Sequence, residues 1–212
     1  MIERKILEEK IRNLENMLLK MYSITVRGVQ AIVDLPSDEA LKIIEESEYS
    51  SDVLNWEIFE EAIATIATQQ PTAKDLRFIV MATTIAAVHE RINDLALDIA
   101  KAIKKIDDVP VELKNSIKTA VETILKMLEV TKNAMVAHSF IDVHDKLSKL
   151  DDIIDGIFRD ALDFLEGKED ISIRTVMNLV MILRDLERIG DLVGKIGARL
   201  IYIETGKMVP IK

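Results

Sequence analysis

His89-Glu-Arg-Ile-Asn-Asp-Leu95 is repeated almost unchanged 97 residues later as Leu186-Glu-Arg-Ile-Gly-Asp-Leu192. The similarity extends beyond these two stretches, since the same offset places Arg77 on Arg174. Similarity at one fixed offset is the signature of a duplicated structural unit. The chain is therefore expected to consist of two related halves.

Apolar residues in both halves recur every three or four positions, as at Ile117 and Val121. This spacing places them on one face of an α-helix, and no segment alternates with the period of two that a strand requires. Prolines beside capping residues mark helix boundaries at Pro36, Pro71 and Pro110. The sequence predicts six long helices, over about residues 3–34, 38–69, 73–106, 110–139, 142–166 and 172–204.

The predicted fold is all-α. Helices of about 40–50 Å suit an antiparallel bundle with short turns. We expect two tandem three-helix units, residues 1–107 and 108–212, packed around a pseudo-two-fold axis. Thr72 and Asp75 resemble a capping box at the start of the third helix, with the threonine oxygen accepting a first-turn amide.

The composition excludes several classes of protein. The chain has 37 acidic and 28 basic residues, a formal net charge of -9 and no cysteine. A chain without cysteine forms no disulfide framework, zinc ribbon or thiol nucleophile, so a metal would need oxygen ligands or one of the three histidines. The acidic balance argues against nucleic acid as a direct partner.

The amino-terminal residues MIERKILEEK are highly charged and lack the apolar core of a secretory leader. The longest uncharged, mostly apolar run, residues 78–88, is well short of the roughly 20 residues that a transmembrane helix needs. We therefore expect a cytoplasmic protein without membrane insertion.

Two pairs of acids stand at corresponding places in the two halves. Glu90 with Asp94, and Glu187 with Asp191, are four residues apart and so lie side by side on a helix. Like charges at this spacing cost a few tenths of a kcal/mol unless a cation lies between them. Charges on a solvated helix face are common, but carrying the same unfavourable pair twice favours a functional explanation.

Further acids lie on the preceding helix of each half. They are Glu48 and Asp52 in the first half and Asp151, Asp152 and Asp155 in the second, while Asp98 extends the Glu90 pair by another turn. If neighbouring helices pack together, four or more carboxylates converge into an oxygen-rich site for Mg²⁺, Mn²⁺, Fe or Zn²⁺. We state this convergence as a hypothesis.

Other conspicuous residues are given structural roles. His89 is interpreted as a packing or surface residue, because a His-Glu-x-x-His zinc motif would need histidine where Asn93 stands. Trp56 and Phe59 are expected to fill the core, whereas an exposed aromatic side chain there would indicate a partner surface.

An ordered set of motifs carries a resemblance to a known family. Gln70-Pro-Thr-Ala-Lys-Asp-Leu-Arg77, followed by Glu90-Arg-Ile-Asn-Asp94 and then Glu187-Arg-Ile-Gly-Asp191, resembles the signatures of the PhoU family of phosphate-uptake regulators. The resemblance covers nearly the whole chain, since length, tandem repeat, helix count and motif order agree. It implies a cytoplasmic, non-enzymatic protein that represses phosphate-starvation signalling and restrains the high-affinity phosphate ABC transporter.

The resemblance also implies partners and a cofactor. The implied partners are the ATPase subunit of the transporter and, in bacteria, the phosphate sensor kinase. Some members bind multinuclear iron or zinc clusters through repeated Glu/Asp-x-x-x-Asp motifs. We expect a hard or borderline metal ion, Fe, Zn, Mn or Mg, and we also expect a homodimer, because long amphipathic helices favour self-association.

The implied metal ligands follow these motifs residue by residue. In the fifth helix, aligning Asp151 with Asp52 puts Leu147 where the motif should open with an acid, and a slip of one turn to Asp151 and Asp155 restores the pair. Asp98 is matched in the second unit by Lys195. The predicted metal ligands are Glu48, Asp52, Glu90, Asp94, Asp98, Asp151, Asp155, Glu187 and Asp191.

Two other classes of function remain open from the sequence. A carboxylate-bridged metalloenzyme in a helical bundle has precedent, but di-iron enzymes of this kind use Glu-x-x-His, and no Glu in this chain has His at the third following position. A purely structural helical scaffold would use the same acids only for solubility.

Overall fold

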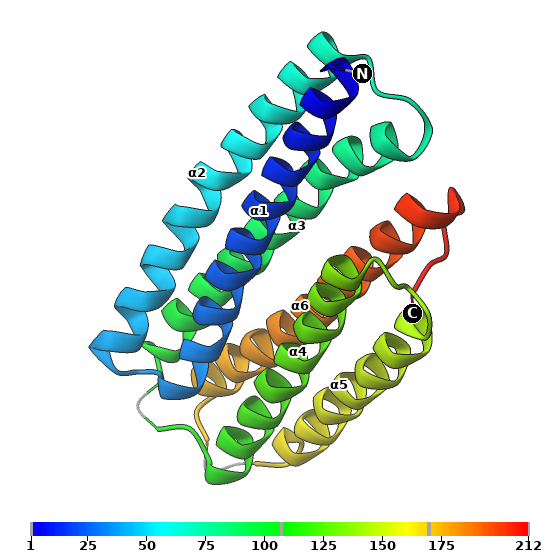
Figure 1. Ribbon diagram of the computed structural model, residues 1–212. Helices are drawn as coiled ribbons and strands as arrows, with labels where there is room; N and C mark the ends of the chain where they lie inside the picture. The colour runs from blue at the N-terminus through cyan, green and yellow to red at the C-terminus, as the bar shows by residue number, and fades with distance from the viewer. Residues whose placement is uncertain (1, 107, 169–170, 212) are drawn as a thin grey trace.

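The computed structural model describes residues 2–106, 108–168 and 171–211, which form six α-helices and one short 3-10 helix (Figure 1). The elements are α1 (Ile2–Ala31), η1 (Ile32–Asp34), α2 (Asp38–Gln69), α3 (Ala73–Ile103), α4 (Val111–Ala137), α5 (Val143–Leu165) and α6 (Ile173–Thr205). The all-α prediction is confirmed, and each helix ends within three residues of its predicted bounds. The predicted boundary between the units, after residue 107, falls at a position outside the described residues.

Side-chain caps fix the starts of two helices. The Ser37 hydroxyl accepts from the Ala40 amide at 3.2 Å at the start of α2, and the Ser172 hydroxyl accepts from the Thr175 amide at 3.1 Å at the start of α6. The capping-box prediction for α3 is wrong, because Thr72 makes no side-chain cap bond. The Asp75 amide, which the Thr72 side chain would have capped, donates instead to the Thr72 carbonyl at 3.1 Å.

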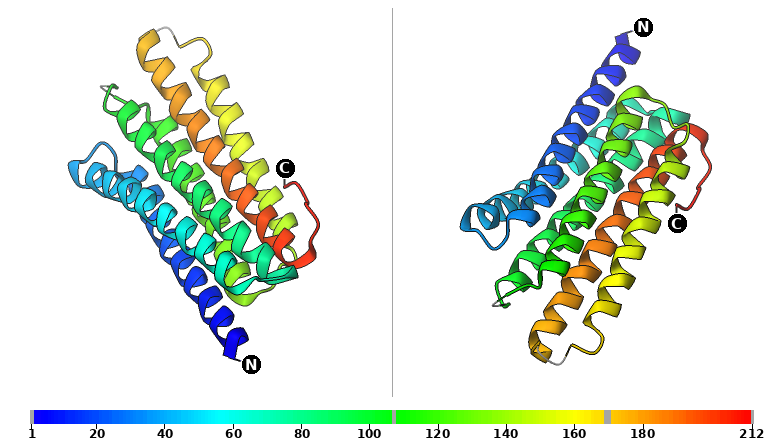
Figure 2. Two further views of the ribbon diagram at one scale, coloured as in Figure 1. Left: turned by 90° about the horizontal axis from the view of Figure 1, so that it is seen from above. Right: turned by 90° about the horizontal axis from the view of Figure 1, so that it is seen from below.

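The two three-helix units pack through corresponding helices. Consecutive helices run antiparallel within each unit, as Figures 1 and 2 show. Between the units, α3 packs along α6 and α1 packs along α4. Both contacts join a helix to its counterpart in the other unit, which is the arrangement that a pseudo-two-fold relation requires.

The central helices α3 and α6 supply matching parts of the core. Ile85, Ile92 and Ile99 of α3 are fully buried. Their counterparts on α6 are equally buried: Ile182, Ile189 and Ile196. Among the described residues, no helix combines the length and the apolar character needed to cross a membrane.

A polar network is buried between α1 and α3. His89 is fully buried, and its Nδ1 lies 3.0 Å from the Thr25 hydroxyl, which also accepts from the Asn93 amide at 3.1 Å. The Tyr22 ring packs at a steep angle to the imidazole, with centroids 4.3 Å apart. Burial lowers the pKa of His89 to about 3, so the ring is neutral at physiological pH. His89 is therefore a packing residue of the core.

The prediction that Trp56 and Phe59 fill the core is wrong. Trp56 is 66% exposed, and Phe59 is also exposed. The buried face of α2 consists instead of residues such as Ser51, Leu54 and Ile58. These buried residues lie on the opposite side of the helix, so the two aromatic side chains face outward.

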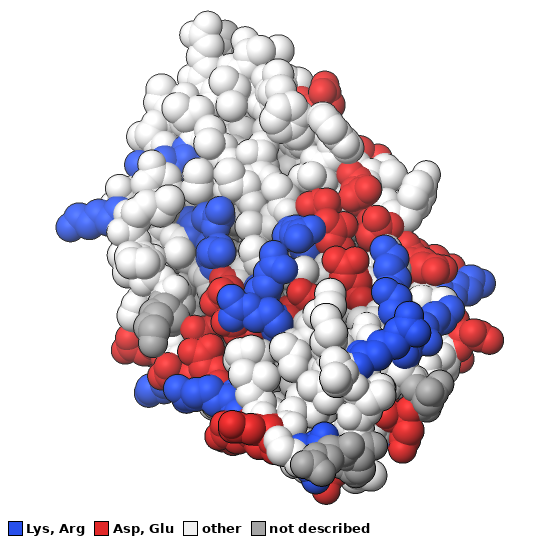
Figure 3. Space-filling model, turned by 180° about the vertical axis from the view of Figure 1, so that it is seen from behind, with Lys and Arg blue, Asp and Glu red and all other residues white. Residues whose placement is uncertain are grey.

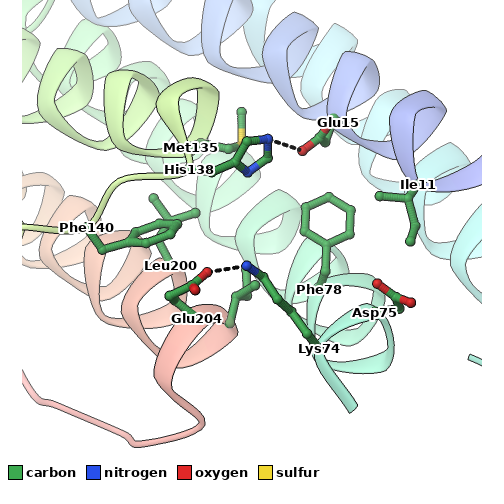
Figure 4. Close-up of a pocket in the computed structure, with 11 residues that line it drawn as sticks. Ile11, Glu15, Lys74, Asp75, Phe78, Met135, His138, Phe140, Leu200 and Glu204 are labelled. Atoms are coloured by element: carbon green, nitrogen blue, oxygen red, sulfur yellow. Dashed lines mark hydrogen bonds and ion pairs between the residues drawn. The ribbon is translucent and has the colours of Figure 1, made fainter. Parts of the chain in front are cut away.

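Ion pairs join the two units around a pocket of about 330 Å³ (Figure 4). Lys74 at the start of α3 pairs with Glu204 at the end of α6, and His138 Nε2 lies 3.5 Å from Glu15 Oε1 on α1. The apolar part of the pocket wall includes Phe78, Met135, Phe140 and Leu200. The Lys74–Glu204 ion pair and the His138–Glu15 contact both cross from one unit to the other, so they tie the units together at this end of the bundle.

The glycines allow a test of how tightly the helices pack. A Cβ atom on Gly28 of α1 would lie 2.9 Å from Asn93 Oδ1 and 3.0 Å from Ser47 Cβ, whereas a Cβ atom on Gly156 of α5 would have no neighbour within 4 Å. We expect Gly28→Ala to lower the free energy of unfolding by about 1–3 kcal/mol through overpacking. Gly156→Ala should raise it by about 0.5–1 kcal/mol, because alanine is the better helix former. Urea denaturation measures both, and equal stabilisation by the two substitutions would contradict the close packing at Gly28.

Candidate metal centres

The first acidic cluster, Glu48, Asp52, Glu90 and Asp94, lies across the antiparallel pair α2–α3. Burial and the nearby carboxylates of Asp52 and Asp94 raise the pKa of Glu48. Burial also raises the pKa of Glu90, and Asp94, Asp52 and Glu48 add to the effect. The four carboxylates are therefore close enough to repel one another, as the sequence predicts.

The second acidic cluster, Asp151, Asp155, Glu187 and Asp191, occupies the corresponding place between α5 and α6. Asp151 is only 8% exposed, and this burial, together with Asp155, Asp191, Asp152 and Glu187, raises its pKa to about 6. Burial is also the main cause of the raised pKa of Glu187. The second cluster is therefore the more strongly desolvated of the two.

The register of α5 resolves the mismatch in the sequence alignment. The carboxylates of Asp155 and Asp191 help to raise the pKa of Asp151, just as those of Asp52 and Asp94 help to raise the pKa of Glu48. Asp151 thus takes the place of Glu48, which is the one-turn slip. Leu147, where the simpler alignment required an acid, is fully buried, and its Cδ1 lies 2.2 Å from where a Cβ atom on Gly197 would stand.

Asp98 is the one predicted ligand that the structure places apart from the clusters. Its Oδ1 lies 3.7 Å from Lys101 Nζ on the same helix. Its negative charge also acts on Asp185 of α6, whose pKa is raised mainly by burial. Asp98 is thus near enough to the other unit to act on Asp185, and it is not among the charges that raise the pKa of Glu48 or Glu90.

Arginines compensate part of the negative charge of each cluster. Arg91 Nη1 lies 2.9 Å from Asp94 Oδ2, and Arg184 Nη1 lies 3.0 Å from Glu187 Oε1. The other carboxylate oxygen of Glu187, Oε2, is buried and has no hydrogen-bond partner. A buried carboxylate oxygen without a partner is costly, so this position fits a bound cation.

Figure 3 shows the side of the molecule that is turned away from the viewer in Figure 1. Asp and Glu side chains gather in its middle and lower parts, with Lys and Arg side chains among them. The upper part, where α2 ends and α3 begins, carries few charges. The carboxylates thus form part of an accessible surface.

The present side-chain positions do not form a closed metal cage. In the part of the chain that the structure describes, no three His, Asp or Glu side chains converge closely enough to hold one metal ion. Asp52 and Asp191 are exposed, and exposed side chains change rotamer within nanoseconds. All the donors are carboxylate oxygens, which suit hard cations that keep several water ligands, as Mg²⁺ does.

Sequence reasoning missed the contact of Asp185 with the first unit. Arg188 Nη1 lies 3.4 Å from Asp185 Oδ1, and both Asp98 and Arg91 across the unit boundary influence the pKa of Asp185. The residue that corresponds to Asp185 in the first unit is Val88. The repeat therefore gave no signal for this residue.

Comparison with known proteins agrees with the fold and the duplication. The model of the PhoU domain matches residues 11–103 and again residues 111–200. The phosphate-specific transport system accessory protein PhoU homolog of Archaeoglobus fulgidus is 28% identical, over 97% of this chain and 98% of that protein. The homolog 1 of Thermotoga maritima is 30% identical, over 85% of this chain and 79% of that protein.

Solved structures show the same architecture. The crystal structure of PhoU from Pseudomonas aeruginosa superposes with a TM-score of 0.79 at 22% identity, covering 97% of this chain and 99% of that one. The regulatory protein PhoU from Streptococcus pneumoniae superposes with a TM-score of 0.77 at 21% identity, covering 96% of this chain and 99% of that one. Since the domain model matches in both three-helix units and together spans most of the sequence, the chain belongs to the PhoU family.

Proposed function

We propose that this protein is an accessory regulator of a phosphate transport system, which restrains phosphate uptake and represses phosphate-starvation signalling. One observation carries the proposal: the chain is covered almost end to end by relatives named as phosphate-specific transport system accessory proteins. These names describe accessory proteins and not enzymes. The protein would act by contact, as an adaptor on the ATPase subunit of the transporter and on the sensor kinase where one is present.

We further propose that the two acidic clusters bind metal ions. Repetition of the cluster in both units, the burial of Asp151 and the unpartnered Oε2 of Glu187 support this. Cations of the Mg²⁺, Mn²⁺, Fe or Zn²⁺ type would neutralise carboxylates that otherwise repel one another. By reducing the repulsion between carboxylates, the metal would make this face more able to contact a partner. We also propose that the protein associates into a homodimer.

Binding of metal can be tested with a double variant that disables both clusters. Asp94→Asn combined with Asp191→Asn removes one carboxylate charge from each cluster while keeping the side-chain shape. After loading with Fe²⁺, Zn²⁺ or Mn²⁺ and desalting, we expect the double variant to lose most of the metal that the unmodified protein retains, measured by elemental analysis. Asp98→Asn is the matched control and should retain metal, because Asp98 lies outside the clusters. Unchanged metal content in the double variant would refute the sites.

The raised pKa of Asp151 predicts a dependence of stability on pH in the metal-free protein. Its pKa is about 6 in the folded state, against the ordinary value of 3.8 for an aspartate in the unfolded chain, so between these values the folded state binds the proton more tightly than the unfolded state. The contribution of Asp151 to stability is therefore most favourable below about pH 4 and decreases until about pH 6. We expect Asp151→Asn to raise the free energy of unfolding by about 1–3 kcal/mol at neutral pH and to have little effect below about pH 4.

Urea denaturation at several pH values, in the presence of a chelator, measures this difference. The raised pKa would be contradicted if the free energies of unfolding of Asp151→Asn and the unmodified protein differed by the same amount at all pH values. Asp155→Asn is a useful comparison, because it removes the neighbouring charge that raises the pKa of Asp151 most. This substitution should reduce the loss of stability between about pH 4 and pH 6 only in part.

The adaptor role predicts a stable contact with the transporter. The full chain, immobilised and incubated with extract from phosphate-replete cells, should retain the nucleotide-binding subunit of the phosphate transporter, identified by mass spectrometry. A bait with Asp94→Asn and Asp191→Asn tests whether the clusters contribute to the contact. If the subunit is missing from every eluate of a folded and abundant bait, the adaptor proposal fails.

A further inference from the structure

An apolar stripe runs along the outer face of α2. We define the α2 stripe as Tyr49, Val53, Trp56, Phe59 and Ile63, whose spacing of three or four residues places them on one side of the helix. All five are exposed, and Tyr49 and Trp56 are 70% and 66% exposed. The Trp56 and Phe59 rings meet edge to face with centroids 5.9 Å apart. Single exposed apolar residues are ordinary, but a continuous stripe containing three aromatic rings indicates a contact surface.

The fold itself does not need the stripe. The opposite face of α2 packs into the core of the first unit, where Ile44, Leu54 and Ile58 are buried. In the second unit, the register in which Asp151 replaces Glu48 gives the residues of α5 that correspond to the stripe. They are Asp152, Gly156, Arg159 and Leu162, together with Glu166 directly after the helix, and only Leu162 is a large apolar residue. The second unit folds without such a stripe, so packing does not account for it.

The helix that carries the stripe is strongly acidic. It contains one basic residue, Lys42, and nine acids: Asp38, Glu39, Glu45, Glu46, Glu48, Asp52, Glu57, Glu60 and Glu61. On the side of α1, a groove of about 480 Å³ adjoins Tyr49 and Val53 and includes Lys20 and Arg27, but Arg27 lies 3.9 Å from Glu46. The charge is therefore mixed where the groove adjoins Tyr49 and Val53, and along the rest of α2 the charged residues are acids apart from Lys42.

These charges decide which occupant fits. A second copy of the chain placed with its stripe on this one would bring two acidic helices together, and juxtaposed like charges disfavour binding. Complementarity instead requires apolar anchors flanked by positive charge. From Tyr49 to Ile63 the stripe extends about 21 Å at 1.5 Å per residue, which matches four turns of a helix.

We propose that the α2 stripe docks an amphipathic helix of another protein whose apolar face is bordered by lysine and arginine. Such packing of one helix against another uses anchors at helical spacing, and aromatic residues dominate the energetics of such contacts. The proposed docking does not need Glu48 and Asp52, the two acids of α2 that belong to the first metal cluster, because seven other acids remain on this helix. Docking of a basic helix and metal binding can therefore fail separately.

Trp56 is the only tryptophan of the chain, so its fluorescence reports directly on the stripe. The probe is an 18-residue peptide of leucine and lysine, with the leucines on one face of a helix and no tryptophan. We expect saturable binding with a shift of Trp56 emission to shorter wavelength. A peptide of the same composition with its order scrambled should bind at least tenfold more weakly, and a version with glutamate for lysine should not bind. Equal binding of the scrambled peptide would overturn the proposal, because charge alone would then explain the attraction.

Two pairs of substitutions localise the binding without changing the charge. Val53→Ser with Ile63→Ser should weaken peptide binding at least tenfold, and it leaves the contact between the Trp56 and Phe59 rings, and hence the Trp56 signal, in place. Met177→Ser with Met181→Ser is the control, since these residues are also exposed but lie on α6, and affinity should stay within about twofold. Circular dichroism and the midpoint of thermal unfolding verify that both variants fold. The proposal is overturned if the stripe variant binds the peptide with undiminished affinity. It is also overturned if Trp56 emission of the unmodified protein shifts on dilution, because a second copy of the chain would then already cover the stripe.

Discussion

The apolar contact between α3 and α6 is the constraint on which the rest of the molecule depends. The two helices pack along each other, and Ile92 of α3 and its counterpart Ile189 of α6 are both fully buried. Helical geometry then leaves Glu90 and Asp94 on the narrow outer strip of α3, with the equivalent acids on the outer strip of α6. The position of each acidic cluster is therefore a consequence of how the central helices are buried, and one interface sets both.

Much of the fold and of the candidate site could be predicted from sequence because the signals are local and repeated. Prolines beside capping residues mark the helix ends, and the repeat at an offset of 97 residues relates α3 to α6. The register of α5 was harder, since Leu147 is a core residue and the acid pair is shifted by one turn. Hydrophobicity alone also could not place Trp56, because an aromatic side chain on a helix suits a core and a docking surface equally well.

The two units share a frame but are packed differently inside. In the first unit, Asn93 on α3 hydrogen-bonds to Thr25, and its Oδ1 lies close to Gly28. In the second unit, the corresponding residue is Gly190, and Ile154 of α5 occupies the space beside it. A polar contact in one half is thus replaced by an apolar one in the other. Contacts of this kind depend on residues of neighbouring helices, so they could not be predicted from the similarity between residues 89–95 and 186–192.

The ion pairs that join the units at one end of the bundle have a mechanical consequence. The helices act as rigid rods, and α2, α3 and α6 each exceed thirty residues, or about 45 Å at 1.5 Å per residue. A tilt of about 5° between the units, pivoting where Lys74 meets Glu204, would move the opposite ends by about 4 Å. A change in the angle between the units would therefore be largest at the end of the bundle away from Lys74 and Glu204, where it would approach the height of a helix turn, about 5.4 Å.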